Sequence, residues 1–288
     1  MKKQNIGNLL IFLSALCFSI NGLFIKLFTW NAMSISAVGN LLGAVTIVIF
    51  MLLTKHKFIF NWKVLFGATF VFGVNVLTTY ANKYTTAANA IVLQFTMPVF
   101  IILASWLFLK KRPNKIDVVT TAIVFLGIIF FVVDGLAIGN MFGNTLALLS
   151  GVACAGVYML EEIPGNDSFS AIVLGKLLCF VVGLPWVVVE QPLGGAALTG
   201  MLVYGIVQCG LGFVFLPLGL KYASSISASL LSSAEPILAP IWVAIFYRSE
   251  TISGTAFVGI SIVVVVLIVY NVIKVNHQDT REEQVYEN

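Results

Sequence analysis

Apolar segments of roughly 20 residues alternate along the chain with short segments that contain charged or turn-forming residues. A helix needs about 20 apolar residues to cross the hydrocarbon layer of a bilayer. The pattern therefore predicts ten transmembrane helices, near residues 7–28, 32–54, 64–82, 86–109, 117–133, 142–160, 169–189, 198–219, 224–247 and 254–273. The predicted fold class is an all-α membrane protein, with a single transmembrane domain over residues 1–288 that ends in a polar tail at 276–288.

The amino-acid composition favours a fold embedded in lipid. Of the 288 residues, 59% are hydrophobic and only 10% are charged, whereas a soluble domain is about half apolar and roughly a quarter charged. The net charge of +4 comes from basic residues between the apolar segments, so it indicates membrane topology and no nucleic-acid partner. The first apolar segment is too long for a cleaved signal peptide and lacks a small-residue cleavage site, so we expect it to be retained.

The distribution of lysine and arginine predicts how the helices are oriented, because positive residues beside a span stay on the cytoplasmic side. With the N-terminus inside, twelve basic residues lie inside and three lie outside, namely Lys26, Lys83 and Arg248. We therefore predict a multi-pass protein of the bacterial inner membrane with both termini in the cytoplasm. Lys176 lies about two turns into the seventh span, and we expect its side chain to extend to the inner surface.

An internal repeat relates the two halves of the sequence. A Lys-Tyr pair, an alanine, a proline and a phenylalanine recur at a constant offset of 138 positions: Lys83 and Lys221, Tyr84 and Tyr222, Ala90 and Ala228, Pro98 and Pro236, Phe108 and Phe246. The repeats are assigned to residues 1–137 and 138–275. Because each repeat has five helices, the second enters the membrane in the opposite orientation, and such inverted repeats are typical of secondary transporters.

Two segments carry a resemblance to a known family. The fourth span contains NAIVLQFTMPVF and the ninth contains SASLLSSAEPILAPIWVAIF, each with small residues, then a proline, then apolar residues up to a charged turn. With the five-plus-five repeat, they make the chain resemble the EamA-type family of the drug/metabolite transporter superfamily over nearly its whole length. The resemblance implies a carrier that exports, or less often imports, a small organic metabolite such as an amino acid or an amine.

The chain departs from that family at the turns after the fourth and ninth spans. The family often has Gly-Glu or Lys-Glu at these turns, whereas this chain has Lys111-Arg112 after the fourth span and Ser249-Glu250 after the ninth. We therefore expect the acid at Glu250 to be structural.

Pro98 and Pro236 lie in the middle of the fourth and ninth spans. Proline lacks a backbone N–H and clashes with the preceding turn, so each helix is expected to bend and to free a carbonyl group. Packing kinks that the membrane tolerates are one interpretation. Matched interruptions in both repeats favour the other, in which the bends line a transport cavity.

Glu235 precedes Pro236 at the centre of the ninth span and is the first candidate for a functional side chain. A carboxylate at the centre of a bilayer costs about 2.5 kcal/mol or more, so it normally faces the interior of the bundle or a water-filled path. Glu235 is therefore a candidate proton carrier or counter-ion for a cationic substrate. The alternative is a structural partner for a polar residue on a neighbouring helix.

Several uncharged polar residues lie within the apolar spans and form a candidate substrate-binding set. Their hydroxyl and amide groups suit a small zwitterion or amine, whereas hydrogen bonds between helices are the alternative for each residue taken singly. The aromatic residues Trp106, Phe213 and Trp242 are further candidates for the wall of a pocket. The polar set consists of Asn21, Asn75, Asn89, Gln94, Tyr158, Gln208, Ser232 and Ser233.

The same sequence argues against other functional classes. The two histidines, His56 and His277, lie in a loop and in the tail, so neither a histidine metal site nor a catalytic dyad can form within the membrane. No phosphate-binding GxxxxGK[ST] motif is present, and no loop resembles a channel filter. We expect no enzymatic activity, cofactor or metal, and we predict a monomer or homodimer whose partners are lipid, a small-molecule substrate and, as a candidate coupling ion, the proton. A receptor or structural protein that transports nothing is the remaining alternative.

Overall fold

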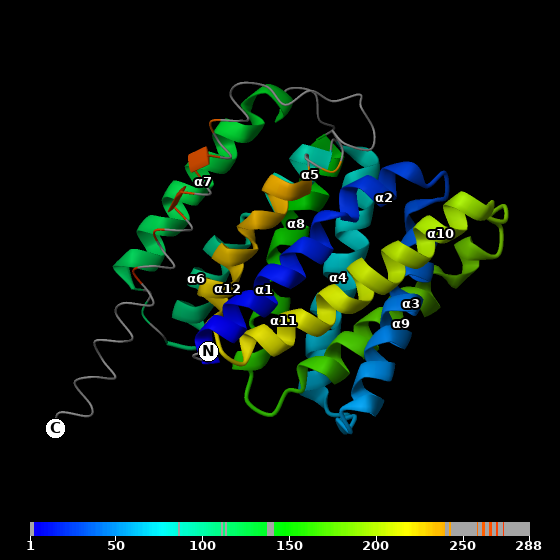
Figure 1. Cartoon of the computed structure of the whole chain (residues 1–288), viewed down its shortest axis with the longest axis horizontal. Coiled ribbons are helices and arrows are strands. Elements are labelled where there is room, and N and C mark those ends of the chain that lie inside the picture. The colour runs from blue at the N-terminus through cyan, green and yellow to red at the C-terminus, as the bar shows by residue number, and fades with distance from the viewer. Residues whose placement is uncertain are drawn as a thin grey trace.

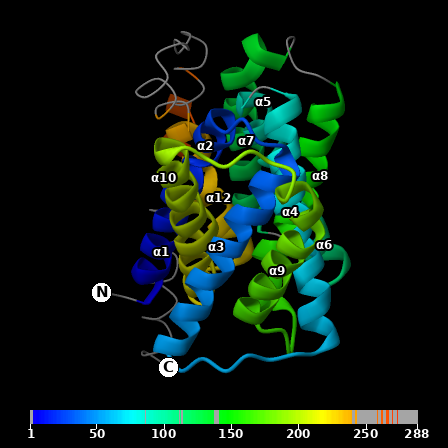
Figure 2. The ribbon, with the colours of Figure 1, turned by 90° about the vertical axis from the view of Figure 1, so that its right-hand side faces the viewer.

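A computed structural model describes residues 3–85, 87–110, 112, 114–136 and 141–239, and positions 242, 258, 261, 262, 265, 266, 269 and 273. Every regular element in these ranges is a helix, and the helices pack side by side in one bundle (Figures 1 and 2). The predicted repeat boundary at 137/138, the turn with Glu250, most of the tenth span and the polar tail lie outside the described residues. The count of ten spans therefore stays a prediction.

The first five predicted spans overlap seven observed helices. The second, third and fifth spans are each one continuous helix, whereas the first and fourth are each divided in two. The helices are α1 (Lys3–Ser19), α2 (Asn21–Leu27), α3 (Ala32–Leu53), α4 (Trp62–Tyr84), α5 (Ala87–Gln94), α6 (Met97–Leu107) and α7 (Lys115–Leu136).

In the second half, the sixth and seventh spans are continuous over most of their length, whereas the eighth and ninth change helix type along the way. The chain is helical again from Glu235 to Ala239, after the last of these elements. The elements are α8 (Met141–Tyr158), η1 (Leu160–Glu162), α9 (Ser168–Val187), α10 (Gly195–Val203), the π-helix η2 (Tyr204–Leu211), α11 (Gly212–Leu220), α12 (Ser225–Leu231) and the 3-10 helix η3 (Ser232–Ala234).

Polar side chains fix where four of these helices begin. The carboxamide oxygens of Asn31 and Asn61, the carboxylate of Asp167 and the hydroxyl of Ser224 accept hydrogen bonds from backbone N–H groups in the first turns of α3, α4, α9 and α12. Such caps satisfy donors that have no partner within the helix. Short polar segments in the sequence therefore end one apolar helix and start the next.

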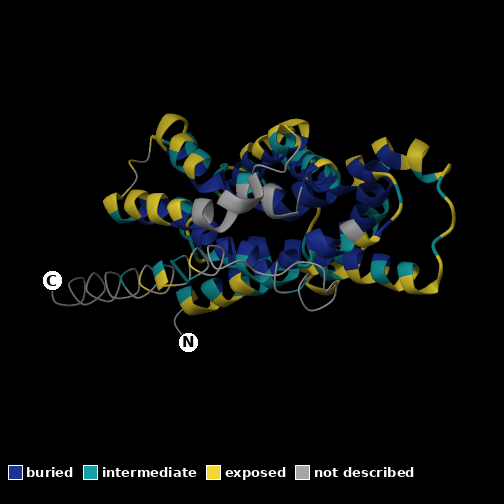
Figure 3. Cartoon of the chain, turned by 90° about the horizontal axis from the view of Figure 1, so that it is seen from above, coloured by how far each residue is buried: buried dark blue, intermediate teal, exposed yellow. Residues whose placement is uncertain are grey.

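The outer surface of the bundle is apolar. Within the described part of the chain, six segments are long and apolar enough to cross a membrane: Lys3–Ile25, Ala32–Leu53, Trp62–Tyr84, Met141–Tyr158, Ser168–Val187 and Gly195–Leu220. Seen from above, exposed residues lie on the outer faces of the helices and buried residues face inward (Figure 3). The exposed residues include large apolar side chains such as Leu53, Phe108 and Val189. An apolar surface of this extent suits lipid rather than water.

Helix pairs in the bundle are reciprocal between the two halves. The first span packs on the eighth through α1 and α11, and correspondingly the third packs on the sixth through α4 and α8. In the same way α3 packs on η2 while α4 packs on α9, and α3 and α9 pack on each other. Exchanging the halves maps this set of contacts onto itself, which is the pattern that two similar halves related by a two-fold axis produce.

The two ends of the bundle differ in charge. At one end, which we call the basic end, six lysines lie beside the ends of α3, α4, α6, α7 and α11: Lys55, Lys57, Lys63, Lys110, Lys115 and Lys221. Lys63 donates to the carbonyl oxygen of Pro164 there, and a groove between α7, η1 and α12 is lined by Arg112, Asp117, Glu161 and Glu162. The other end is fastened by bonds between the halves, such as those from Trp30 Nε1 to the Gln191 carbonyl and from the Asn31 N–H to the Glu190 carboxylate. Most of the basic residues predicted to be cytoplasmic and described here belong to the basic end.

Candidate functional site

A pocket lies between the two halves of the chain. Its walls come from α1, α2, α4 and α5 of the first half and from α8, η2, α11 and the segment after η3 of the second. The free volume is about 40 Å³, which holds only a few water molecules. The polar side chains in its wall are Asn21, Asn75, Thr78, Thr79, Gln94, Tyr158, Tyr204, Gln208 and Glu235.

Six of the residues singled out in the sequence line this one pocket, although they come from six different spans: Asn21, Asn75, Gln94, Tyr158, Gln208 and Glu235. Ser232 lies directly behind it and accepts a hydrogen bond of 2.6 Å from the Tyr158 hydroxyl. Ser233 is buried and bonds to its own helix, and the side chain of Asn89 lies outside the described residues. Of the aromatic candidates, Phe213 lines the pocket, whereas Trp106 is exposed on the outer surface.

Interruptions of the helices bring four of these polar residues into the pocket. Asn21 begins α2 just after the break at Ile20, and Gln94 is the last residue of α5. Gln208 belongs to the π-helix η2, and Glu235 follows the 3-10 helix η3. Broken helices in transporters free backbone groups and direct side chains toward a substrate site, and π-helical turns are frequent at functional sites.

The two prolines lie beside two of the interruptions. Pro98 is the second residue of α6, directly after the turn at Phe95 and Thr96, and Pro236 follows η3 by one residue. Because proline has no N–H to donate, it fits the start of a helical segment. Neither proline contributes to the described wall of the pocket.

Glu235 is the only acid in the wall of the pocket that the structure describes. The residue is 7% exposed, and no hydrogen bond or salt bridge joins its carboxyl group to any described residue. A buried carboxyl group without a partner is unfavourable and therefore calls for a proton or a cation.

The remaining polar groups of the pocket are held in place by neighbouring residues. The Thr78 hydroxyl donates to Gln94 Oε1 at 3.1 Å, which links α4 to α5. Asn75 Nδ2 donates to the carbonyl oxygen of Val71 at 2.7 Å, so the side-chain oxygen of Asn75 takes no part in this bond. The Tyr158 bond to Ser232 links α8 to η3. Fixed side chains of this kind present donors and acceptors without further loss of conformational freedom on binding.

Sequence reasoning missed three polar residues of the wall, namely Thr78, Thr79 and Tyr204. Thr78 and Thr79 lie one helical turn after Asn75, and Tyr204 lies about one turn before Gln208, so each shares a face with a residue that was identified. The spacing therefore contained a signal for these three residues, although threonine and tyrosine are common in membrane helices and identify no site by themselves.

The expectation for Lys176 was wrong. Its side chain is 0% exposed and does not extend to the inner surface. Nζ donates to Asn40 Oδ1 at 2.9 Å and lies 3.8 Å from the centre of the Phe213 ring. Lys176 projects from the face of α9 that packs on α3, so its side chain points into the bundle.

Known proteins resemble the chain over most of its length. An uncharacterised transporter of Bacillus subtilis strain 168, YwfM, is 24% identical over 285 residues, which cover 93% of this chain and 94% of the relative. An uncharacterised transporter of Archaeoglobus fulgidus is 29% identical over 247 residues, which cover 80% of this chain and 85% of the relative. Both relatives carry a transporter name without a substrate.

A solved crystal structure, described only as that of a protein, shares the fold. It superposes with a TM-score of 0.79 at 16% identity and covers 94% of this chain and 98% of its own. The sequence also matches the EamA-like transporter family over residues 5–133 and 141–272. The two matched segments together span most of the chain, and the polar pocket lies between them, so the protein belongs to the EamA-like transporter family.

Proposed function

We propose that this membrane transporter is a secondary-active carrier of a small organic metabolite, such as an amino acid or an amine. The carrier works by alternating access between its two five-helix halves and acts as an exporter in the bacterial inner membrane, with both termini in the cytoplasm. One observation carries the proposal: a buried carboxyl group without a partner among the described residues, Glu235, lies in a polar pocket between the halves.

Glu235 gives a physical reason for coupling to protons. In a closed pocket an ionised carboxylate with no partner is strongly disfavoured. The carrier therefore closes and reorients only when Glu235 holds a proton or the cationic group of a substrate. Because the two cannot be held at once, inward movement of a proton drives outward movement of the substrate.

The arrangement of the helices supports alternating access. The pocket is bordered by both halves, and their contacts are reciprocal, so rocking one half against the other can open the pocket first at one end and then at the other. The concentration of basic residues at one end supports the cytoplasmic orientation of that end. With a free volume of about 40 Å³, the pocket is too small for a metabolite and has to widen before it admits one.

The test is to express the wild type, Glu235→Gln and the control Glu161→Gln in a bacterium. Glu161 is an exposed acid at the basic end and does not line the pocket. Untargeted mass spectrometry then compares metabolites in the cells and in the medium with those of cells that lack the protein. We expect the wild type and Glu161→Gln to move at least one metabolite into the medium, and Glu235→Gln to move little of it.

The outcomes separate the parts of the proposal. If Glu235→Gln redistributes the same metabolite as the wild type, the carrier function stands and Glu235 is structural. If the wild type accumulates the metabolite inside the cells, the direction is import. If no variant changes any metabolite although each is present in the membrane, transport of a metabolite is wrong, and a receptor or structural protein becomes the better interpretation.

A further inference from the structure

A lysine lies buried at the middle of a membrane-spanning helix. Lys176 is the ninth of the 20 residues of α9, and its side chain is 0% exposed. Among the described residues, Nζ donates to Asn40 Oδ1 and lies over the face of the Phe213 ring, and the thiol groups of Cys179 and Cys209 lie near it. No carboxylate of a described residue lies within salt-bridge distance of Lys176 Nζ. An ionisable residue within a membrane is rare and usually marks the path of an ion or a substrate.

Asn40 is oriented to receive the ammonium group. Its Nδ2 donates to the carbonyl oxygen of Ser36 at 2.8 Å and lies 3.3 Å from the Ser36 hydroxyl oxygen. These bonds turn Oδ1 toward Lys176. An amide oxygen and an aromatic face both attract a cation, but neither supplies the full negative charge that would neutralise it.

Close helix contacts make the surroundings of Lys176 rigid. A Cβ atom on Gly39 would lie 2.4 Å from the Tyr204 ring, and one on Gly43 would lie 2.5 Å from the carbonyl oxygen of Cys209. The helix α3 therefore packs directly on η2 at the level of Asn40. Lys176 thus occupies a fixed position in the junction between α3, α9 and the π-helix.

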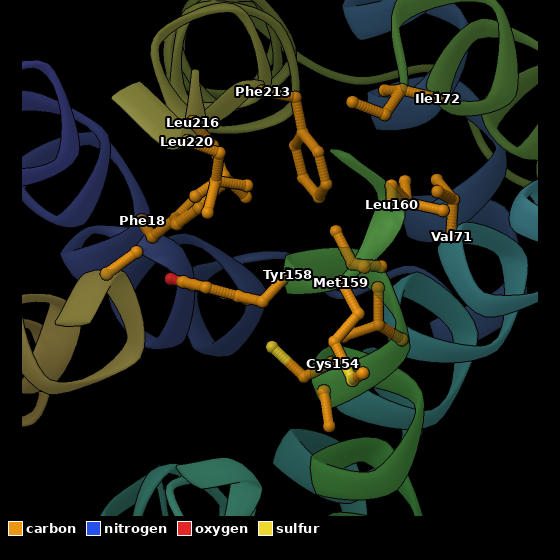
Figure 4. Close-up of a cluster of buried hydrophobic side chains, with 14 of the residues drawn as sticks. Phe18, Val71, Cys154, Tyr158, Met159, Leu160, Ile172, Phe213, Leu216 and Leu220 are labelled. Atoms are coloured by element: carbon orange, nitrogen blue, oxygen red, sulfur yellow. The ribbon is translucent and has the colours of Figure 1, made fainter. Parts of the chain in front are cut away.

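Phe213 separates this lysine from the pocket. The ring lines the pocket and also covers Lys176 Nζ at 3.8 Å. It projects from α11 into the centre of a cluster of buried side chains (Figure 4) and packs edge-on against Phe18 with 4.9 Å between the ring centres. Rotation of this one side chain would join the pocket to the ammonium group and would enlarge a pocket that is too small for a metabolite.

We infer that Lys176 binds an anionic group of the transported metabolite once Phe213 turns aside. The inference rests on the proposed function and narrows its substrate to a molecule that carries a carboxylate or phosphate as well as a cationic group. Glu235 receives the cationic group and Lys176 the anionic one. Each buried charge then gains a partner in the same step, and the loaded site carries no excess charge through the membrane.

The test uses proteoliposomes loaded with an equimolar mixture of matched pairs that differ in the anionic group. The pairs are leucine and isoamylamine, phenylalanine and phenethylamine, and phosphoethanolamine and ethanolamine, and mass spectrometry measures how fast each leaves. The readout is the ratio of rates within a pair, because a merely structural defect lowers both members alike. The pair that shows a preference distinguishes a carboxylate from a phosphate.

We expect the wild type to prefer the anionic member of at least one pair and Lys176→Gln to lose that preference by about tenfold or more, the usual effect of removing a charged hydrogen-bond partner. Lys176→Arg should retain part of it. Lys221→Gln is the matched control. Lys221 Nζ also lies over a phenylalanine ring, 5.6 Å from the centre of the Phe169 ring, but Lys221 is exposed at the basic end. Its ratio should equal that of the wild type.

A second variant covers the case in which Lys176→Gln does not fold. Phe213→Leu keeps the lysine and removes the ring that covers it, so the preference for the anionic member should be maintained or increased. The inference is overturned if Lys176→Gln keeps the wild-type ratio, if the wild type releases only the amines, or if Phe213→Leu abolishes the preference. Failure of the proposed function gives a different result: vesicles with the wild type then release no compound faster than loaded vesicles without protein, and the inference is wrong as well.

Discussion

Glu235 and Lys176 are two buried charged side chains near the same pocket, and the protein holds them in different ways. Glu235 follows an interrupted helix, faces the pocket and has no partner for its carboxyl group among the described residues. Lys176 lies on the unbroken helix α9, bonds to Asn40 and is covered by Phe213. The acid is therefore ready to exchange its partner, whereas the lysine becomes available only after a side chain moves.

The comparison also shows what decides whether a membrane lysine reaches the surface. From the depth of Lys176 in its span we expected the side chain to extend to the inner surface of the membrane. Its position is instead decided by the side of α9 from which it projects. Ile172, Cys179 and Gly183 share its buried side of α9, whereas Leu177 and Val181 on the other side are exposed. Small residues recur every fourth position beside Lys176, at Gly175, Cys179 and Gly183. They mark the side of α9 that packs on other helices.

The largest difference between the two sites should appear in proton coupling. Glu235→Gln retains the size and polarity of a protonated carboxyl group but cannot release a proton. In proteoliposomes we expect transport driven by a pH gradient to fall by about tenfold or more, the range typical of losing an essential proton-transfer group. Exchange of labelled for unlabelled substrate across the membrane should also fall, because Glu235 receives the cationic group of the substrate, and the exchange that remains should no longer depend on pH.

Lys176→Gln is the contrasting variant for that measurement. It should lower exchange and gradient-driven transport together, but the exchange that remains should keep its dependence on pH, because Glu235 still takes up and releases a proton. The comparison between the two charges would fail if exchange by Glu235→Gln kept the pH dependence of the wild type, since another group would then carry the coupling proton.

The sequence predicted the main polar residues of the site but not how they meet. Asn21, Gln94 and Gln208 stand out because each is a carboxamide within an apolar segment. Their convergence depends on pairing of the first span with the eighth and of the third with the sixth, and hydrophobic pattern alone carries no information about such pairing. The π-helix was also beyond prediction, since no residue in Tyr204–Leu211 forbids an ordinary α-helix.

A smaller effect is expected from loosening the lysine junction. Gly43→Ala would bring a methyl group against the backbone of Cys209, where only 2.5 Å separates it from the carbonyl oxygen. The resulting strain should lower the free energy of unfolding by about 1–3 kcal/mol, the typical effect of overpacking. It should also weaken the preference for anionic substrates, because η2 shifts away from Asn40 and Lys176.

Gly194→Ala provides the control, because a Cβ atom there meets no other atom within 4 Å. Thermal unfolding in detergent should show a change within about 0.5 kcal/mol for this variant. Equal stability of the two alanine variants would mean that α3 and η2 can separate freely, and the argument that Lys176 is rigidly placed would then be wrong.

The smallest effect should come from a histidine–aspartate contact outside the membrane-spanning core. His56 Nε2 lies 2.8 Å from the Asp167 carboxylate, and both side chains contact solvent at the basic end. Water screens such a pair, so His56→Gln should change the free energy of unfolding by only about 0–1 kcal/mol.

Asp167→Ala should cost more, about 1 kcal/mol, because this carboxylate also caps α9 through the N–H of Ser170. Thermal unfolding of both variants measures the two contributions, since His56→Gln removes only the contact between the side chains and Asp167→Ala removes the cap as well. If His56→Gln were the more damaging change, attachment of the loop between α3 and α4 to α9 would be a main source of stability, and charge near water would matter as much in this protein as charge within the bundle.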